Sequence, residues 1–102
     1  MSEFIKVMPA SELAPGQCRE VLVGSKPVAL FNVDGVFYAL SNLCLHRGGP
    51  LGQGFLSGTA VMCPWHAWTW DVRTGEHTIN PELKVPCYEV KLEEGNVLVS
   101  VD

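Results

Sequence analysis

Two cysteines and two histidines stand in two short motifs that could form a metal site. The motif Cys44-Leu-His46 is separated by sixteen residues from the motif Cys63-Pro-Trp-His66. Thiolate sulfur and imidazole nitrogen are the usual protein ligands of zinc and iron, and one such pair on each of two loops can complete a single site. The spacing therefore predicts a metal centre held by Cys44, His46, Cys63 and His66.

The distribution of the ligands bears on the identity of the metal. A zinc finger of the common kind takes two cysteines from a hairpin and two histidines from a helix, whereas here each loop supplies one of each. A two-iron cluster with cysteines on one iron and histidines on the other fits this pattern better. Gly48 and Gly49 would let the first loop approach the cluster closely. A structural zinc module is the competing hypothesis, and the colour of the purified protein distinguishes the two.

Strand signals dominate the rest of the chain. Short runs rich in Val, Leu, Phe and Tyr alternate with Gly, Pro, Asp and Asn. They predict strands over 3–7, 18–23, 27–33, 36–40, 59–63, 87–92 and 96–101. Asp34-Gly35 predicts a two-residue type I′ hairpin turn, and 24–27 and 93–96 predict further turns. The only helical signal is a single turn over 10–13. This pattern is typical of an antiparallel sandwich or small barrel.

The organisation is that of one domain, because 102 residues hold a single hydrophobic core. Its middle part, about 42–86, contains both motifs, all three tryptophans and all three histidines, together with many glycines and prolines. We therefore expect a basal part, about 1–41 and 87–102, that presents a loop-rich site formed by about 42–86.

Composition and charge exclude several classes of function. The net charge is −4 and acidic residues are scattered along the chain, which argues against nucleic-acid binding and favours a basic protein partner. The sequence shows neither a basic, apolar leader nor a run of about 18 apolar residues, so a cytoplasmic protein without membrane contact is expected. Four cysteines in such a chain indicate metal or thiol chemistry.

Several residues outside the four ligands also carry expectations. Cys18 and Cys87 fall in predicted strands and are expected as small, buried apolar side chains, with a disulfide between them as the less favoured alternative. His77 is expected on the surface. Trp68 and Trp70 are expected to pack the second loop against the sheet.

The stretch CLHRGGPLGQGFLSGTAVMCPWHAWTWDVRTGE resembles the cluster-binding region of Rieske-type ferredoxins, and the strand-forming ends and NPELKVPCYEV extend the resemblance over essentially the whole chain. The resemblance implies an all-β Rieske fold, with an antiparallel β-sandwich base and a small loop-rich cluster-binding subdomain. It also implies one [2Fe-2S] cluster, in which Cys44 and Cys63 hold the buried iron and His46 and His66 the iron near the surface.

The same resemblance assigns residues around the cluster. Pro81 lies where the family has a proline-containing loop that covers the cluster as a third wall, although it could simply form a turn. Trp65 is expected at the cluster rim, either shielding the cluster or contacting a partner. Arg47 would anchor an acidic group of a partner or remain solvated. Ala67 replaces the more usual glycine, which affects how tightly the second loop approaches.

The cluster neighbours predict a low redox potential. High-potential members resemble CTHLGC and CPCHGSxY, with two extra cysteines in a disulfide and Ser and Tyr hydroxyls that donate to the cluster. This chain has Gly49, Trp65, Trp68 and Trp70 at the corresponding positions. Without those donors the reduced cluster is less stabilised. We expect a potential near the low end of the roughly −150 to +300 mV window of Rieske centres.

A coordinatively complete cluster has no open position for a substrate, and the sequence shows no nucleophile with a base, phosphate loop or dinucleotide fingerprint. The chain is therefore expected to be no enzyme by itself but a one-electron carrier. The resemblance implies transfer from an NAD(P)H-dependent flavoprotein reductase to a terminal oxygenase. The alternative is a small subunit or accessory of an NAD(P)H-dependent nitrite reductase, which shares the fold.

Overall fold

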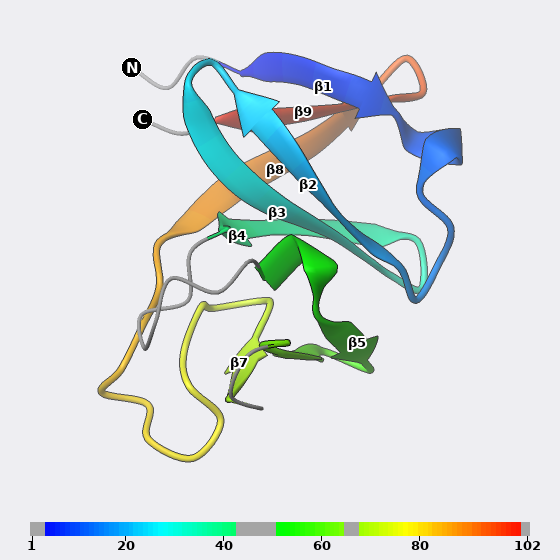
Figure 1. Ribbon diagram of the computed structural model, residues 1–102. Helices are drawn as coiled ribbons and strands as arrows, with labels where there is room; N and C mark the ends of the chain where they lie inside the picture. The colour runs from blue at the N-terminus through cyan, green and yellow to red at the C-terminus, as the bar shows by residue number, and fades with distance from the viewer. Residues whose placement is uncertain (1–3, 43–50, 65–67, 101–102) are drawn as a thin grey trace.

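The computed structural model describes residues 4–42, 51–64 and 68–100. In these ranges the chain forms a six-stranded and a three-stranded antiparallel sheet (Figure 1). The large sheet has the order β1-β9-β8-β4-β3-β2 and the small sheet the order β5-β6-β7. The large sheet consists of β1 Ile5–Pro9, β2 Cys18–Val23, β3 Lys26–Val33, β4 Val36–Ser41, β8 Cys87–Glu93 and β9 Asn96–Ser100. The small sheet consists of β5 Phe55–Ser57, β6 Ala60–Met62 and β7 Thr69–Asp71.

Each of the seven strands predicted from the sequence has a counterpart in the structure. The predicted helical turn is the 3-10 helix η1, Ala10–Glu12. Sequence reasoning missed β5, β7 and the 3-10 helix η2, Leu51–Gln53. Each of these elements is three residues long. They were missed because so short a segment shows no periodicity.

Two of the three predicted hairpin turns are confirmed by positive φ values at both of their central residues. Asp34 and Gly35, between β3 and β4, have φ values of 51° and 91°. Glu94 and Gly95, between β8 and β9, have φ values of 52° and 79°. Positive φ at both central residues matches the right-handed twist of the flanking strands. These turns fix the strand registers of the large sheet.

Side chains of the central strands alternate between two cores, because successive residues of a strand point to opposite faces. The basal core consists of Met8, Leu13, Val23, Val28, Leu30, Phe37, Ala39, Val97 and Val99. The interface core consists of Ala29, Phe31, Leu40, Leu51, Val61, Cys63, Trp70, Val72 and Val85. The large sheet curls until β1 and β2 touch, and the small sheet packs on the opposite face of β3 and β4.

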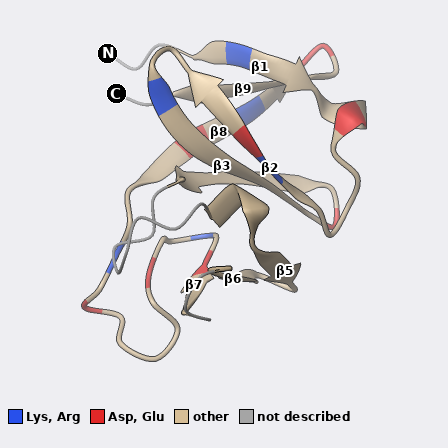
Figure 2. Ribbon diagram, in the orientation of Figure 1, with Lys and Arg blue, Asp and Glu red and all other residues tan. Residues whose placement is uncertain are grey.

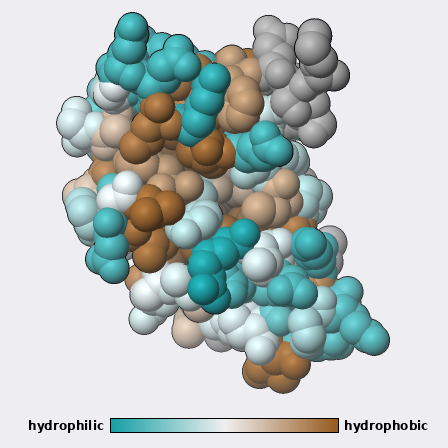
Figure 3. Space-filling model, turned by 180° about the vertical axis from the view of Figure 1, so that it is seen from behind, coloured by the Kyte–Doolittle hydropathy of each residue, from teal (hydrophilic) through white to brown (hydrophobic). Residues whose placement is uncertain are grey.

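The described surface has no face-wide patch of one charge. Lys and Arg are spread among Asp and Glu over the large sheet and the loops (Figure 2). From behind, apolar side chains gather beside the large sheet, and a separate apolar group lies at the lower tip (Figure 3). None of the described helices has the length or hydropathy needed to cross a membrane.

Candidate functional site

The chain on either side of the first motif is joined at Asn42. The backbone N–H of Leu51 donates to the Asn42 carbonyl oxygen at 2.8 Å. The N–H of Gly52 donates to Asn42 Oδ1 at 2.7 Å. These two hydrogen bonds therefore hold the residue that follows β4 against the start of η2, on either side of the segment 43–50.

Glu20 on β2 holds this junction to the large sheet. Asn42 Nδ2 donates to Glu20 Oε2 at 2.6 Å, and Gln53 Nε2 donates to Glu20 Oε1. Asn42 is only 4% exposed. A Cβ at Gly52 would lie 2.6–2.9 Å from Glu20 Cγ, N and Cα, so only glycine fits there. Sequence reasoning missed this network, and the one signal for it was an asparagine directly after a strand.

The second motif lies at the end of the β6–β7 hairpin. Met62 pairs with Thr69, and the N–H of the next residue, Cys63, donates to the Trp68 carbonyl oxygen at 2.7 Å. Cys63 is 2% exposed, belongs to the interface core and is a free thiol in the described part of the chain. The hairpin therefore closes the second motif at its base and places one sulfur in apolar surroundings.

A third loop, 78–82, lies beside this hairpin. Leu83 N–H donates to the Asn80 carbonyl oxygen at 3.0 Å, so Pro81 occupies the second position of a β-turn. This is the position that proline favours, because its ring fixes φ. Thr78 N–H donates to the Thr69 carbonyl oxygen at 3.0 Å, which ties the loop to β7. Pro81 thus forms a turn, whereas its expected role in a loop that covers the cluster stays a prediction.

The surface position predicted for His77 is wrong. His77 is 9% exposed, and its ring stands edge-on to Trp68 and Trp70, with centroid distances of 4.9 and 5.1 Å. The antiparallel bridge between Trp70 and His77 brings these rings together. The sequence contained no pairing signal for it, because β7 has only three residues. The predicted packing of the two tryptophans is confirmed, since Trp70 is fully buried and Trp68 packs against the interface core.

The remaining cysteines correct a second expectation. Both are free thiols, so the disulfide alternative is wrong. Cys18 is half-buried and its thiol donates to the Gly54 carbonyl oxygen at 3.4 Å. Cys87 is exposed rather than buried, because it shares the outward face of β8 with Glu89 and Lys91. Partial desolvation of the sulfur raises the pKa of both thiols above the ordinary cysteine value, even though the Cys87 side chain as a whole is exposed.

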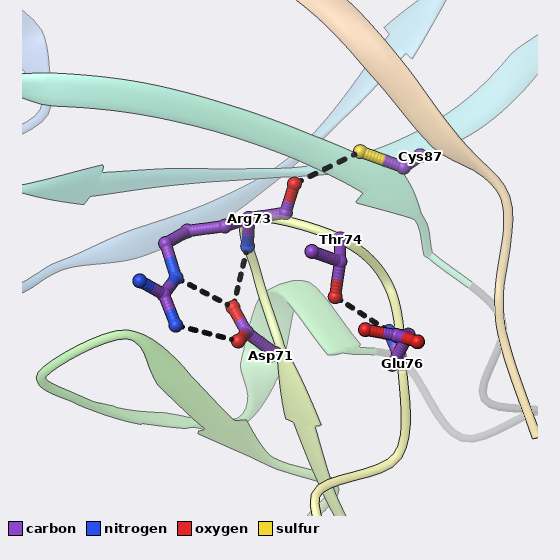
Figure 4. Close-up of polar contacts among 5 residues, drawn as sticks. All are labelled: Asp71, Arg73, Thr74, Glu76 and Cys87. Atoms are coloured by element: carbon purple, nitrogen blue, oxygen red, sulfur yellow. Dashed lines mark hydrogen bonds and ion pairs between the residues drawn. The ribbon is translucent and has the colours of Figure 1, made fainter. Parts of the chain in front are cut away.

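A charged turn connects β7 to the third loop (Figure 4). Arg73 Nε and Nη2 donate to Asp71 Oδ1 and Oδ2 at 3.1 and 2.9 Å, and Arg73 N–H also donates to Oδ1. The hydrogen bonds from the Arg73 side chain lower the pKa of Asp71. The Arg73 carbonyl oxygen accepts from the Cys87 thiol at 3.6 Å. These contacts fix the path of the chain from β7 toward the third loop.

The predicted site residues fall only partly in the described ranges. Cys63, Trp68 and Pro81 are described. The others lie outside the described residues: Cys44, His46, Arg47, Gly48, Gly49, Trp65, His66 and Ala67. Within 4–42, 51–64 and 68–100 no three His, Cys, Asp or Glu side chains gather into a possible metal site.

The described residues fit a metal–sulfur group. Cys63 offers a buried sulfur that has no hydrogen-bond partner among the described residues, and thiolate is the ligand that iron–sulfur clusters require. Trp70 Nε1, in the same core, is a buried donor that likewise has no described partner. Each motif-bearing segment is also tied at its base, by Asn42 in one case and Trp68 in the other. The arrangement suits two loops that hold one group between them.

Comparison with known proteins establishes the family. The model of the Rieske [2Fe-2S] domain matches residues 3–89, and the chain belongs to this family. Ferredoxin CarAc of Metapseudomonas resinovorans is 35% identical over 99 residues, covering 95% of this chain and 92% of the relative. The ferredoxin component of the naphthalene 1,2-dioxygenase system of Pseudomonas putida is 32% identical over 100 residues, covering 97% and 96%.

Solved structures agree with this assignment. The chain matches one from a complex of reduced oxygenase and oxidized ferredoxin in carbazole 1,9a-dioxygenase with a TM-score of 0.86 and 34% identity, covering 95% of this chain and 92% of that one. It matches a putative NADH-dependent nitrite reductase small subunit from Mycobacterium tuberculosis with a TM-score of 0.92 over 100% and 97% of the chains. The identity in that case is 23%, so this likeness shows the fold alone.

The protein is thus a Rieske-type ferredoxin, and its cofactor is a [2Fe-2S] cluster. Relatives that it matches along nearly their whole length are named ferredoxins or ferredoxin components of dioxygenase systems, and like them it is an electron carrier. The predicted family, fold class, cofactor and carrier role are confirmed.

Proposed function

We propose that this chain passes single electrons from an NAD(P)H-dependent flavoprotein reductase to the terminal oxygenase of a ring-hydroxylating dioxygenase system. The observation that carries the proposal is the likeness, along nearly the whole chain, to ferredoxins named as components of such systems. A ferredoxin that matches this chain at 34% identity belongs to a complex with its oxygenase. The net charge of −4 favours basic docking surfaces on the partners.

The cluster ligands are proposed to be Cys44 and Cys63 on one iron and His46 and His66 on the other. The burial of Cys63 in the interface core supports its place on the inner iron. When bound, the cluster would supply a centre that takes up and releases one electron. Residues proposed to surround it are Arg47, Gly48, Gly49, Trp65, Ala67, Trp68 and Pro81.

We also propose that the chain is divided into a basal part, about 1–41 and 87–102, and a cluster-binding part, about 42–86. All strands of the large sheet come from 5–41 and 87–100, and all strands of the small sheet from 55–71. The interface core lies between the two sheets. This arrangement would separate the scaffold from the loops that hold the cluster.

Substitution of Cys63 tests the ligand assignment, with Cys87→Ser as the matched control. Both substitutions replace a sulfur by an oxygen, but Cys63 is buried at the second motif and Cys87 is exposed on β8. Cys63→Ser should abolish the cluster and destabilise the fold, because metal binding is coupled to folding. Cys87→Ser should retain about two irons and two sulfides per chain and a rhombic EPR signal after reduction. A full cluster spectrum in Cys63→Ser would refute the ligand assignment.

Redox titration and partner assays test the rest of the proposal. The midpoint potential at pH 7 should lie in the lower part of the roughly −150 to +300 mV Rieske window, and a value above about +100 mV would contradict the low-potential assignment. Reduction by a flavoprotein reductase and electron delivery to an oxygenase should both be measurable with purified components. Stable co-purification with a large sirohaem-containing subunit would favour the nitrite reductase alternative. The proposed electron source is the cytoplasmic NAD(P)H pool, so we also propose a cytoplasmic location.

A further inference from the structure

His77 is a buried side chain that neither of the two motifs includes. Its Nδ1 accepts hydrogen bonds from the backbone N–H groups of Ile79 and Asn80, each at 3.1 Å. A nitrogen that accepts two N–H groups carries no hydrogen itself, so the ring hydrogen of the neutral imidazole lies on Nε2. The lone pair of Nδ1 is also engaged and is not offered to a metal.

These two hydrogen bonds order the start of the third loop. An acceptor that binds the N–H groups two and three residues further on usually comes from Asn, Asp, Ser or Thr. Here histidine takes that role for Ile79 and Asn80. The residue after Asn80 is Pro81, which has no N–H that needs an acceptor. The backbone N–H of His77 donates to the Leu83 carbonyl oxygen at 2.9 Å and closes the loop at its far end.

The ring of His77 connects this loop to the second motif. The ring stands edge-on to that of Trp68 at a centroid distance of 4.9 Å. The backbone carbonyl oxygen of Trp68 in turn accepts a hydrogen bond from Cys63 N–H, at the base of the second motif. A surface hollow beside the contact is lined by Trp68, Thr69, His77, Ile79, Asn80 and Leu83. Ile79 is 85% exposed.

We propose that His77 is a positioning residue for electron transfer. Its acceptor nitrogen holds the third loop in shape, and its ring presses that loop against Trp68 beside the second motif. The loop would thereby shield this side of the proposed cluster from water, and solvent exposure is one of the factors that set the potential of an iron–sulfur centre. This role rests on the proposed ligand role of Cys63.

Three substitutions in the holoprotein separate the two contacts of His77. His77→Asn keeps an acceptor for the two N–H groups but removes the ring. His77→Phe keeps a ring beside the tryptophans but removes the acceptor. His77→Ala removes both. Glu82→Asp is the matched control, because it keeps the charge of an exposed side chain in the same loop.

Amide hydrogen exchange at Ile79 and Asn80 is the first readout. Exchange should become about tenfold faster in His77→Phe and His77→Ala, because each N–H loses its acceptor. Exchange in His77→Asn should stay near that of the parent, since the acceptor is restored. Unchanged exchange in His77→Phe would overturn the proposal. This readout requires only the folded chain, so it separates a failure of the inference from a failure of the proposed function.

The midpoint potential is the second readout, measured on variants with full cluster content. His77→Ala should raise the potential, because added water stabilises the more negative reduced cluster. His77→Asn and His77→Phe should each shift it less, and Glu82→Asp, which keeps the charge, should leave it unchanged. If His77→Ala does not load a cluster, the smaller shifts of the other two variants carry the test. Potentials equal to that of the parent in every loaded His77 variant would refute the positioning role.

Discussion

Removal of the Asn42 side chain should destabilise the protein more than any surface change. Asn42→Ala eliminates the hydrogen bonds to Glu20 Oε2 at 2.6 Å and from Gly52 N–H at 2.7 Å. Two net hydrogen bonds contribute about 1 kcal/mol each, and a buried N–H left without an acceptor costs a further 1–3 kcal/mol or so. Gly52 is buried. The expected loss in free energy of unfolding is therefore about 3–5 kcal/mol.

Urea unfolding of the holoprotein under anaerobic, reducing conditions measures this loss. Tryptophan fluorescence would report the fold, and visible absorption would report the cluster. Because Asn42 joins both ends of the segment that contains Cys44 and His46, the cluster should bleach at lower urea together with the fold. Asn96→Ala is the control, since the side chain of Asn96 makes one long, exposed hydrogen bond of 3.4 Å. A loss below about 0.5 kcal/mol in Asn42→Ala would refute this account of the junction.

Substitutions that change the charges of Asn42 and Glu20 test the same contact more directly. Asn42→Asp keeps an acceptor for Gly52 N–H but places a carboxylate against that of Glu20, and like charges at this distance repel. Combining it with Glu20→Gln restores a donor to the contact, and the new amide oxygen still accepts from Gln53. The double variant should be more stable than Asn42→Asp alone. Additive or worse effects would show that Glu20 does not hold the junction through this hydrogen bond.

Two further predictions follow from the glycines and thiols. Gly75→Ala should lower the free energy of unfolding by about 2 kcal/mol or more, because φ is +83° and the new Cβ would lie 2.3 Å from the Val85 carbonyl oxygen. Gly58→Ala, with positive φ but no atom within 4 Å, should lower it by about 1 kcal/mol. Equal thermal midpoints of the two variants would contradict this. Iodoacetamide should label the exposed Cys87 before the half-buried Cys18. Both rates should rise with pH beyond the ordinary cysteine pKa, because partial desolvation of each sulfur raises the pKa of both thiols and only the thiolate reacts. Mass spectrometry would detect the order, and equal labelling at neutral pH would contradict it.

The sequence by itself determined the chemistry and most of the strands. Thiol and imidazole ligands in two closely spaced pairs restrict the metal chemistry whatever the fold, so the motifs alone predicted a two-iron cluster. Strand positions could also be predicted, because the alternation of apolar and polar residues and the choice of turn residues depend on only a few neighbouring positions. Asp34 and Gly35 are examples, since their positive φ values are a local property of the turn. Such signals need no knowledge of distant contacts.

Only the tertiary structure decided which residues support the site. Glu20, Asn42 and Gly52 come from β2, the end of β4 and η2, and their hydrogen bonds exist only because the sheet brings these elements together. His77 is buried for the same reason, since Trp70 on β7 meets it across one antiparallel bridge and Trp68, directly before β7, contacts its ring. A polar residue reads as exposed in a sequence until its partners are known. The identity of the ligands can therefore be predicted from the local sequence, whereas the residues that support the ligands are set by long-range packing.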